Sequence, residues 1–211
     1  KSTYGIKSSN HTFYVKDDAI YHRSSNKVIT KIKELKLKGK HNLLNFLAAA
    51  TCAYICGVKI ENIKNVFRTF KGIPHRIEYV NTIMGVDYIN DSKATNIQSV
   101  IVAINSFENP IILILGGKNK NSDFRLLLPH TKRHVKHIVS YGEAGGEIAA
   151  AIGDAVRLNR VSSLSQAVAS AHKLAAPGDI VLMSPGCASF DQFKNFEERG
   201  NKFADLVKSL N

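Results

Sequence analysis

The sequence has no tryptophan, only three cysteines and five prolines, and far fewer acidic than basic residues. Such a small, odd number of cysteines excludes a disulfide scaffold, so a cytoplasmic location is expected. No apolar run approaches the ~18 residues of a membrane-spanning helix. The opening residues lack the apolar core of a secretory signal and Lys1 is not a methionine, so we expect the chain to begin inside a longer protein.

The formal net charge is +12, from 29 Lys and Arg against 17 Asp and Glu. This balance favours anionic partners: nucleic acid, membrane surfaces, or small phosphorylated and carboxylated ligands. Lysines between positions 31 and 40 alternate roughly with Ile32, Leu35 and Leu37, as on a half-exposed strand. Because no aromatic residue interrupts this run to stack on bases, a solvated strand is favoured over a nucleic-acid site.

Two of the cysteines, Cys52 and Cys56, are spaced to share one face of a helix. The surrounding segment is rich in alanine and holds no second pair of metal ligands. Buried thiols in a helical core are therefore expected there, and no metal site is predicted in the chain.

Residues 1–73 are predicted to contain short strands followed by two helices. The first helix, 42–56, is almost entirely apolar and is therefore expected to be buried on most faces. In the second, apolar residues recur at i, i+3, i+4 and i+7 from Ile63, and a domain boundary follows at 72–74. The strands are predicted at 3–6, 12–15, 19–22 and 27–36.

Residues 74–211 alternate short apolar runs with amphipathic helical segments. This alternation predicts an α/β fold, a Rossmann-like domain with a mostly parallel sheet covered on both faces. A Ser163-x-x-Gln166 capping box opens one helix. The strands are predicted at 76–80, 86–90, 111–115, 135–140 and 180–183, and the helices at 96–107, 163–176 and 191–210.

Three of these strands end in polar turns rich in small residues, at 90–96, 116–120 and 184–191. The carboxyl ends of strands in an open α/β sheet face one crevice, so we expect the three turns to share a ligand. The second turn has a glycine pair but no G-x-G-x-x-G fingerprint, which disfavours NAD. The first offers a carboxylate, an ammonium, a hydroxyl and an amide from Asp91, Lys93, Thr95 and Asn96.

Two further pairs of residues are candidates for ligand contacts. Asn42 and Asn45 lie three residues apart on one helix face, where two side-chain amides can read a base edge. Helix capping by Asn42 is the equally favoured alternative. His75 and Arg76 lie at the predicted boundary, a common place for a ligand clamp, although such a pair is often only a solvated linker.

Five motifs, in order along the chain, resemble those of the Mur ligase family, and specifically its D-glutamate-adding branch. The Asp-Asn-Pro-Arg stretch of the branch that adds diaminopimelate or lysine is absent. The resemblance covers nearly the whole chain. Its motifs are Gly39-x-His41-Asn42-x-x-Asn45, Gly72-x-Pro74-His75-Arg76-x-Glu78, Asn90-Asp91-Ser92-Lys93-Ala94-Thr95-Asn96, Gly116-Gly117-x-x-Lys120 with Asp123-Phe124, and Ser184-Pro185-x-x-Ala188-Ser189-Phe190-Asp191-x-Phe193.

The resemblance implies that residues 1–73 end a central ATP-binding domain and that residues 74–211 form a C-terminal, D-glutamate-binding domain. In this family ATP phosphorylates a carboxylate of UDP-N-acetylmuramoyl-L-alanine, and the amine of D-glutamate attacks the resulting acyl phosphate. Positioned cations lower such a barrier by stabilising concentrated negative charge.

The resemblance also implies roles for individual residues. Arg76 and Lys93 are the catalytic candidates, because they would approach the phosphates. D-Glutamate would be surrounded by Thr95, Lys120, Ser189, Phe190 and Phe196, the last of which also suits an ordinary core stripe. The other nucleotide contacts would come from Asn42 and Asn45 at adenine, His75 beside the base and Asp91 at the ribose.

The sequence departs from the family where ATP chemistry is concerned. It has no G-x-x-x-x-G-K-[ST] motif, and no glycine precedes Lys1-Ser2-Thr3, which only mimics its end. ATP and Mg²⁺ are the expected cofactors, with the Mg²⁺ ligands in an upstream region. The chain alone is therefore predicted to be inactive, and a monomer is favoured. The alternatives left open are a basic nucleic-acid-binding module and a noncatalytic nucleotide-binding domain.

Overall fold

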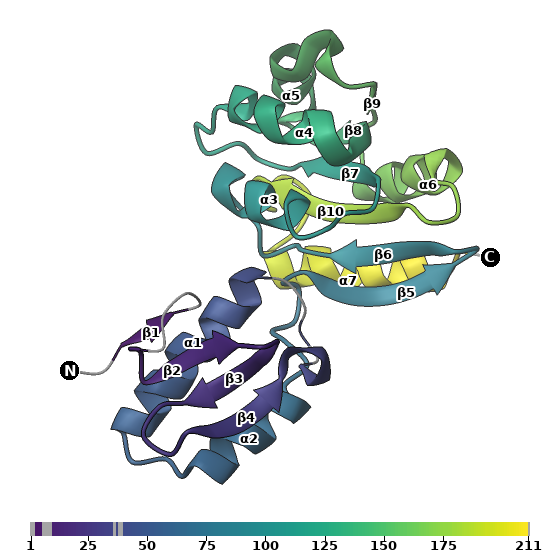
Figure 1. Cartoon of the computed structure of the whole chain (residues 1–211). Coiled ribbons are helices and arrows are strands. Elements are labelled where there is room, and N and C mark those ends of the chain that lie inside the picture. The colour runs from purple at the N-terminus through teal and green to yellow at the C-terminus, as the bar shows by residue number, and fades with distance from the viewer. Residues whose placement is uncertain (1–2, 6–9, 36, 38–39, 211) are drawn as a thin grey trace. The chain divides into compact units, whose positions relative to one another are not determined.

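The computed structural model describes residues 3–5, 10–35, 37 and 40–210. The chain divides into two compact units, Lys1–Gly72 and Ile73–Asn211 (Figure 1). Each unit has its own sheet and its own buried apolar residues.

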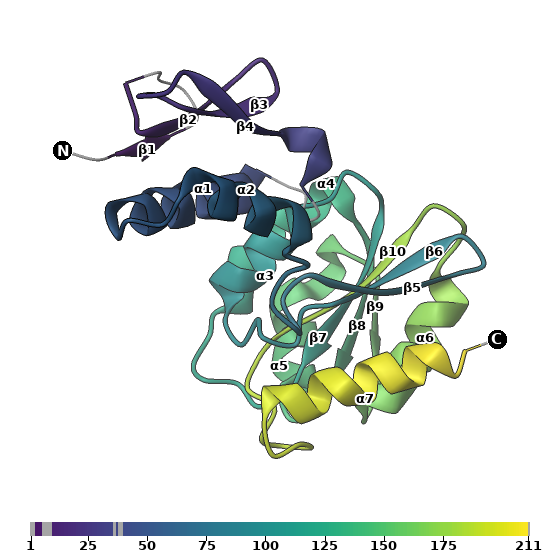
Figure 2. The same cartoon turned by 90° about the horizontal axis from the view of Figure 1, so that it is seen from below.

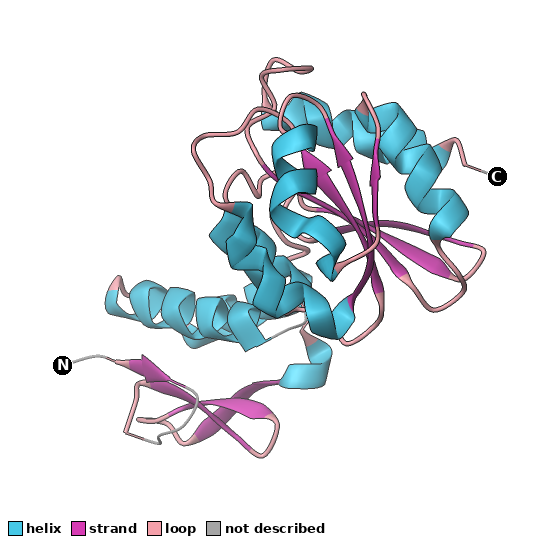
Figure 3. Ribbon diagram, turned by 90° about the horizontal axis from the view of Figure 1, so that it is seen from above, coloured by secondary structure: helices cyan, strands magenta, loops and turns pink. Residues whose placement is uncertain are grey.

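The first unit is a four-stranded sheet with two helices on one face (Figures 2 and 3). Its elements are β1 (Tyr4–Gly5), β2 (Phe13–Lys16), β3 (Ala19–His22), β4 (Lys27–Lys31), α1 (Lys40–Ile55) and α2 (Ile60–Thr69). β2, β3 and β4 form an antiparallel meander, and β1 pairs with β2 in parallel. Its core includes Phe13, Ile20, Leu47 and Phe67.

The strand predicted at 27–36 is too long. β4 ends at Lys31, and a short 3-10 helix (Ile32–Glu34) follows it. The alternation of lysine and apolar residues therefore does not continue the strand. Residues 36, 38 and 39 of that run lie outside the described residues.

The prediction that α1 is buried on most faces is also wrong. Leu43, Phe46 and Leu47 are buried, whereas Leu44, Tyr54 and Ile55 are exposed. Cys52 and Cys56 are exposed as well, so they are not the core thiols expected from the sequence. Within this unit α1 packs against β1, β2 and α2, and an apolar composition does not by itself bury the rest of its surface.

The second unit contains a six-stranded sheet made of β5 (Glu78–Ile83), β6 (Val86–Asn90), β7 (Ile111–Gly116), β8 (Val135–Tyr141), β9 (Leu158–Arg160) and β10 (Ile180–Gly186). Their order is β5-β6-β10-β7-β8-β9, with β5 antiparallel to β6 and the other pairs parallel. All residues of β7 and β10 are buried, as in strands covered on both faces. The predicted α/β fold with a mostly parallel sheet is confirmed.

Helices cover both faces of this sheet (Figure 3): α3 (Ile97–Ile104), α4 (Leu128–His134), α5 (Gly145–Ile152), α6 (Leu164–Leu174) and α7 (Phe196–Lys208). One apolar cluster joins the sheet to α3 and α5 through residues such as Val100 and Ile148. A second joins the other face to α6 and α7 through Val168 and Phe203. The sheet is thus the middle layer of three.

Helix caps explain two boundaries in this unit. Ser163 caps α6 as predicted, because its hydroxyl accepts a hydrogen bond from the N–H of Gln166 at 3.3 Å. The last helix, predicted from residue 191, begins only at Phe196. The side chain of Asn195 caps it by accepting from the N–H of Glu198 at 2.8 Å.

Two glycines let the end of β7 approach its neighbours closely. Gly116 and Gly117 have φ of +146° and +122°, which L side chains rarely adopt. A Cβ at Gly116 would overlap the carbonyl oxygen of Tyr141, and one at Gly117 would overlap that of Ala188. The glycine pair is therefore required by the packing of backbone on backbone.

We predict that Gly117→Ala destabilises the second unit far more than Gly178→Ala. Gly178 also has positive φ, +91°, but nothing lies within 4 Å of a Cβ placed there. Gly178→Ala should therefore cost about 1–2 kcal/mol from the backbone alone, whereas the overlap at Gly117 should bring the loss to about 3 kcal/mol or more. Urea unfolding of the two variants measures both, and equal losses would contradict the close approach.

Candidate functional site

The three polar turns lie side by side at one edge of the second unit's sheet. β10 lies between β6 and β7 and is parallel to both, with Met183 level with Asn90 and Gly186 level with Gly116. The N–H of Gly186 donates to the carbonyl of Ala94 at 2.9 Å. The turns thus meet where the strand order predicts, through direct backbone contacts.

The turns after β7 and β10 are also paired with each other. Lys118 and Ala188 form an isolated antiparallel bridge. Each N–H donates to the other's carbonyl, at 2.9 Å and 3.0 Å. Ser189 follows Ala188 directly and Lys120 lies two residues after Lys118, so the bridge joins the two stretches that carry these expected substrate contacts.

Asp91 is buried with a 3% exposed fraction. Its Oδ1 accepts from the N–H of Ile77 at 3.1 Å, and its Oδ2 accepts from the hydroxyl of Ser184 at 2.7 Å. Burial raises the pKa of this carboxyl to about 6, although both hydrogen bonds and the Arg76 guanidinium lower it. The carboxylate expected at a ribose is therefore enclosed and already has two donors, and its ribose contact stays a prediction.

His75, expected beside the base, is packed within the second unit. The backbone N–H of His75 donates to Oε2 of Glu78 at 2.8 Å. Its ring Nδ1 lies 3.0 Å from the side-chain nitrogen of Asn90. A Cβ at Gly200 would overlap the imidazole, so that glycine makes room for the ring on α7. The imidazole is therefore held between Asn90 and α7, and its contact with a base stays a prediction.

Arg76 and Lys93 remain exposed. Arg76 lies between two residues with left-handed backbone, His75 at φ +63° and Ile77 at φ +46°. This irregular stretch explains why β5 begins at Glu78 rather than at residue 76. The ammonium of Lys93 lies 4.5 Å from the ring centroid of Phe196.

The residues expected around D-glutamate come from the three adjacent turns and the start of α7. Lys120 is exposed, and its Nζ lies 6.0 Å from the ring centroid of Phe190, which is 64% exposed. Ser189 is buried beside Phe190, and Thr95 is half-buried. Phe196 is half-buried at the first position of α7, where its ring contacts Lys93 and His75.

Asn42 and Asn45 belong to the first unit. Both lie in the first turns of α1, where Asn42 is half-buried and Asn45 is exposed. Their spacing places them on one helix face, as expected. Their contact with adenine stays a prediction.

Arg199 contacts the turns after β6 and β10, and no sequence prediction identifies it. It lies on α7 with a fully buried side chain. Its guanidinium and Nε donate to the hydroxyl and carbonyl of Ser92 and to the carbonyl of Cys187, at 2.9–3.1 Å. The sequence contains a pattern that indicates its burial, because residue 199 is at helical spacing between Phe196 and Phe203, on the apolar face of the helix.

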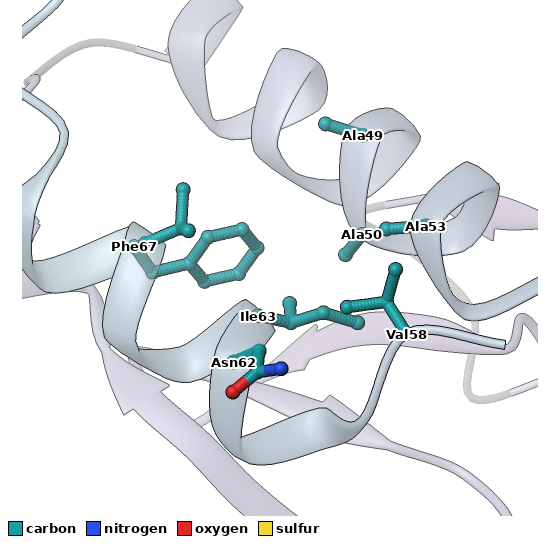
Figure 4. Close-up of a pocket in the computed structure, with 8 residues that line it drawn as sticks. Ala49, Ala50, Ala53, Val58, Asn62, Ile63 and Phe67 are labelled. Carbon is teal, nitrogen blue, oxygen red and sulfur yellow. The ribbon is translucent and has the colours of Figure 1, made fainter. Parts of the chain in front are cut away.

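The first unit has an apolar groove of about 150 Å³ between α1 and α2. Figure 4 shows side chains from both helices that line it. Asn62 is the one polar residue among Ala49, Ala50, Ala53, Val58, Asn62, Ile63, Val66 and Phe67. A groove without a charged group does not suit a phosphate or a carboxylate.

Among the described residues, no group of three or more His, Cys, Asp or Glu is arranged to hold a metal ion. No helix in the described part of the chain is both long and apolar enough to cross a membrane.

Comparison with known proteins gives a consistent result. The sequence model of the family described as Mur ligase, glutamate ligase domain, matches residues 75–187. UDP-N-acetylmuramoylalanine–D-glutamate ligase from Bacillus cytotoxicus is 42% identical over 198 residues, which are 93% of this chain and 44% of that protein. The ligase of the same name from Acidobacterium capsulatum is 46% identical over 179 residues, 85% of this chain and 39% of that one. The chain thus spans less than half the length of these curated relatives.

Solved structures agree on the fold. MurF from Acinetobacter baumannii superposes with a TM-score of 0.69 at 15% identity, over 99% of this chain and 47% of that one. MurC from Thermotoga maritima superposes with a TM-score of 0.68 at 15% identity, over 99% of this chain and 48% of that one. At this identity the likeness concerns the fold alone.

We predict that Asp91 makes the stability of the second unit depend on pH. Its pKa of about 6 in the folded unit lies above the ordinary 3.8, so the folded state holds this proton more tightly than the unfolded chain. The stabilisation that comes from this proton is fully present below the pKa that the carboxyl has in the unfolded chain. It is lost as the pH rises through the pKa that the carboxyl has in the folded unit. Each pKa unit corresponds to about 1.4 kcal/mol, so the free energy of unfolding should fall by an amount on the order of 3 kcal/mol.

Asp91→Asn cannot ionise and isolates this effect from the other carboxyl groups. The free energy of unfolding of the wild type, minus that of Asp91→Asn, should fall by that amount between about pH 4 and pH 7. Urea unfolding at several pH values measures it. A constant difference across the range would mean that the burial of Asp91 does not control its titration.

Proposed function

Because the chain belongs to the Mur ligase family, we propose that it is the C-terminal part of an ATP-dependent ligase that adds D-glutamate to UDP-N-acetylmuramoyl-L-alanine in peptidoglycan synthesis. The names and the 42–46% identity of the curated relatives support this branch of the family. The observation that carries the proposal is the meeting of three turns at one sheet edge, two of which carry exposed lysines. A cytoplasmic location is part of the proposal.

D-Glutamate is a dicarboxylate, and the crevice offers groups that bind carboxylates. The exposed ammonium of Lys120 supplies a charge partner, and Thr95 and Ser189 supply hydroxyl donors. Phe190 is exposed at the same edge and can cover the methylene groups between the two carboxylates. We place the amino-acid substrate among these four residues, with Phe196 at their margin.

The nucleotide and its phosphates are assigned to the exposed cations near the unit boundary. Arg76 and Lys93 would stabilise the charge that develops as the phosphoryl group is transferred and as phosphate leaves. Lys93 then exchanges its contact with Phe196 for a phosphate oxygen. Asn42, Asn45 and His75 are assigned to the adenine, and Asp91 to the ribose.

Mg²⁺ is expected in the parent reaction, but the described residues contain no group of three acidic, histidine or cysteine side chains that fits it. No step is therefore assigned to a metal in this chain. Its own contribution is to bind D-glutamate, orient its amine and present cations to the phosphates.

We predict that Lys120→Ala weakens D-glutamate binding by about tenfold or more, because a charge-assisted hydrogen bond to a carboxylate is lost. Isothermal titration of the chain with D-glutamate measures this, and a parallel titration with ADP should show no change. Lys132→Ala, which removes an exposed lysine of α4, is the matched control. Equal affinity in the wild type and in Lys120→Ala would remove Lys120 from the site.

The chain by itself is predicted to show no ligation. Its sequence has no P-loop motif to hold the triphosphate. Incubation with ATP, D-glutamate and UDP-N-acetylmuramoyl-L-alanine should release no phosphate above the level seen without protein. Release that depends on D-glutamate and disappears in Lys93→Ala would show that the chain is sufficient for turnover.

A further inference from the structure

The side chain of Arg199 is the largest among those that are almost completely buried in the described structure. Among the described residues it forms no ion pair with a carboxylate. Its charge is met by dipoles instead: the carbonyls of Ser92 and Cys187 and the hydroxyl of Ser92. Burying an arginine in this way costs solvation, so the arrangement calls for a physical explanation.

The groups that Arg199 binds belong to two different turns of the crevice. Ser92 lies in the turn after β6, directly before Lys93, and Cys187 lies in the turn after β10, two residues before Ser189. The guanidinium therefore spans the two loops and joins each of them to α7. The hydroxyl of Ser92 adds a second link to α7, because it donates to the carbonyl of Phe196 at 2.7 Å.

The turn after β7 is shaped around the same side chain. A Cβ placed at Gly117 would lie 3.1 Å from a terminal nitrogen of Arg199. The absence of a side chain at Gly117 thus leaves room for the guanidinium beneath the bridge between Lys118 and Ala188. The turns after β6 and β10 thus form hydrogen bonds with the guanidinium, and the turn after β7 leaves space for it.

We propose that Arg199 is a positioning residue of the ligation reaction: it sets the separation of the turn that carries Lys93 and Thr95 from the turn that carries Ser189. This inference rests on the proposed function, since those three residues are its phosphate and D-glutamate contacts. Arg199 touches neither reactant and acts through the backbone of Ser92 and Cys187. A displacement of about 1 Å between such turns costs about 10²-fold in rate.

A lysine cannot replace this arginine. The planar guanidinium places its N–H groups in a fixed fork, and here it reaches two carbonyls and one hydroxyl at once. An ammonium keeps the charge but offers one donor atom on a flexible stem. Arg199→Lys therefore separates the effect of geometry from the effect of charge.

The test uses the 211-residue chain and D-glutamate. Arg199→Lys should weaken D-glutamate binding by about tenfold or more, measured by isothermal titration, through loss of alignment between the turns. In the ligand-free protein, the backbone amide resonances of Lys93, Thr95 and Ser189 should shift in the NMR spectrum. Arg199→Lys retains the charge, so a purely electrostatic role predicts unchanged binding.

Val168→Ala is the matched control for lost stability. Val168 is buried in the apolar cluster that joins the sheet to α6 and α7, and its aliphatic side chain cannot form a hydrogen bond with the turns. Its truncation should lower the unfolding temperature while leaving D-glutamate affinity and the three amide resonances unchanged. If Arg199→Lys does not fold, Ser92→Ala removes the hydroxyl alone and should shift the same amides with a smaller loss of affinity.

The outcomes separate this proposal from the one it rests on. A wild type that binds D-glutamate and a folded Arg199→Lys that binds it equally, with unshifted amides, overturn the positioning role alone. Equal losses of D-glutamate affinity in Arg199→Lys and Val168→Ala also overturn the positioning role, because lost stability alone would then explain the effect. A wild type that does not bind D-glutamate overturns the proposed function, and the positioning role falls with it.

Discussion

Parallel strands end with backbone N–H and C=O groups that have no further ladder partners, and a buried strand end must satisfy them by other means. In the second unit, backbone pairs between the turns provide some of these partners, and polar side chains provide others. Arg199 donates to the carbonyls of Ser92 and Cys187, which lie in the turns after β6 and β10. The requirement to pair buried backbone groups thus determines which side chains lie beneath the crevice and how closely its turns approach.

The polar residues of the crevice divide into two sets by burial. Asp91 and Arg199 are buried and have their hydrogen bonds satisfied within the protein. Arg76, Lys93 and Lys120 are exposed, and each is a cation. A buried group that is already paired gains little from a ligand, whereas an exposed cation can exchange water for an anion at small cost. We therefore assign the binding of anions to the exposed cations, and the positioning of the turns to Arg199.

The sequence was sufficient to predict the layered α/β fold of the second unit and its three turns. Short apolar runs indicate the strands, and the small polar residues after them indicate where the strands end. Burial was harder to predict. Cys52 and Cys56 lie in an apolar segment, yet burial depends on which elements contact that side of α1, and local composition does not record this.

Arg199 escaped prediction for a related reason. Periodicity treats a charged residue as a sign of solvent, so a cation at helical spacing between Phe196 and Phe203 is set aside as an interruption of the apolar face. Its partners are mostly backbone carbonyls, which every residue has and no sequence motif marks. A charged residue in register with a buried stripe, beside a glycine such as Gly200, is the pattern that could have revealed it.

The stretch around Arg76 shows how two unfavourable features support one another. A β-branched residue with left-handed backbone, as at Ile77, costs on the order of 1–3 kcal/mol. A carboxylate enclosed as deeply as Asp91 is also costly, and its raised pKa reflects this. The hydrogen bond from the N–H of Ile77 to Asp91 joins the two, so each is sustained by the other. Together the two features fix the backbone between His75 and Ile77, and they thereby fix the point from which the Arg76 side chain extends.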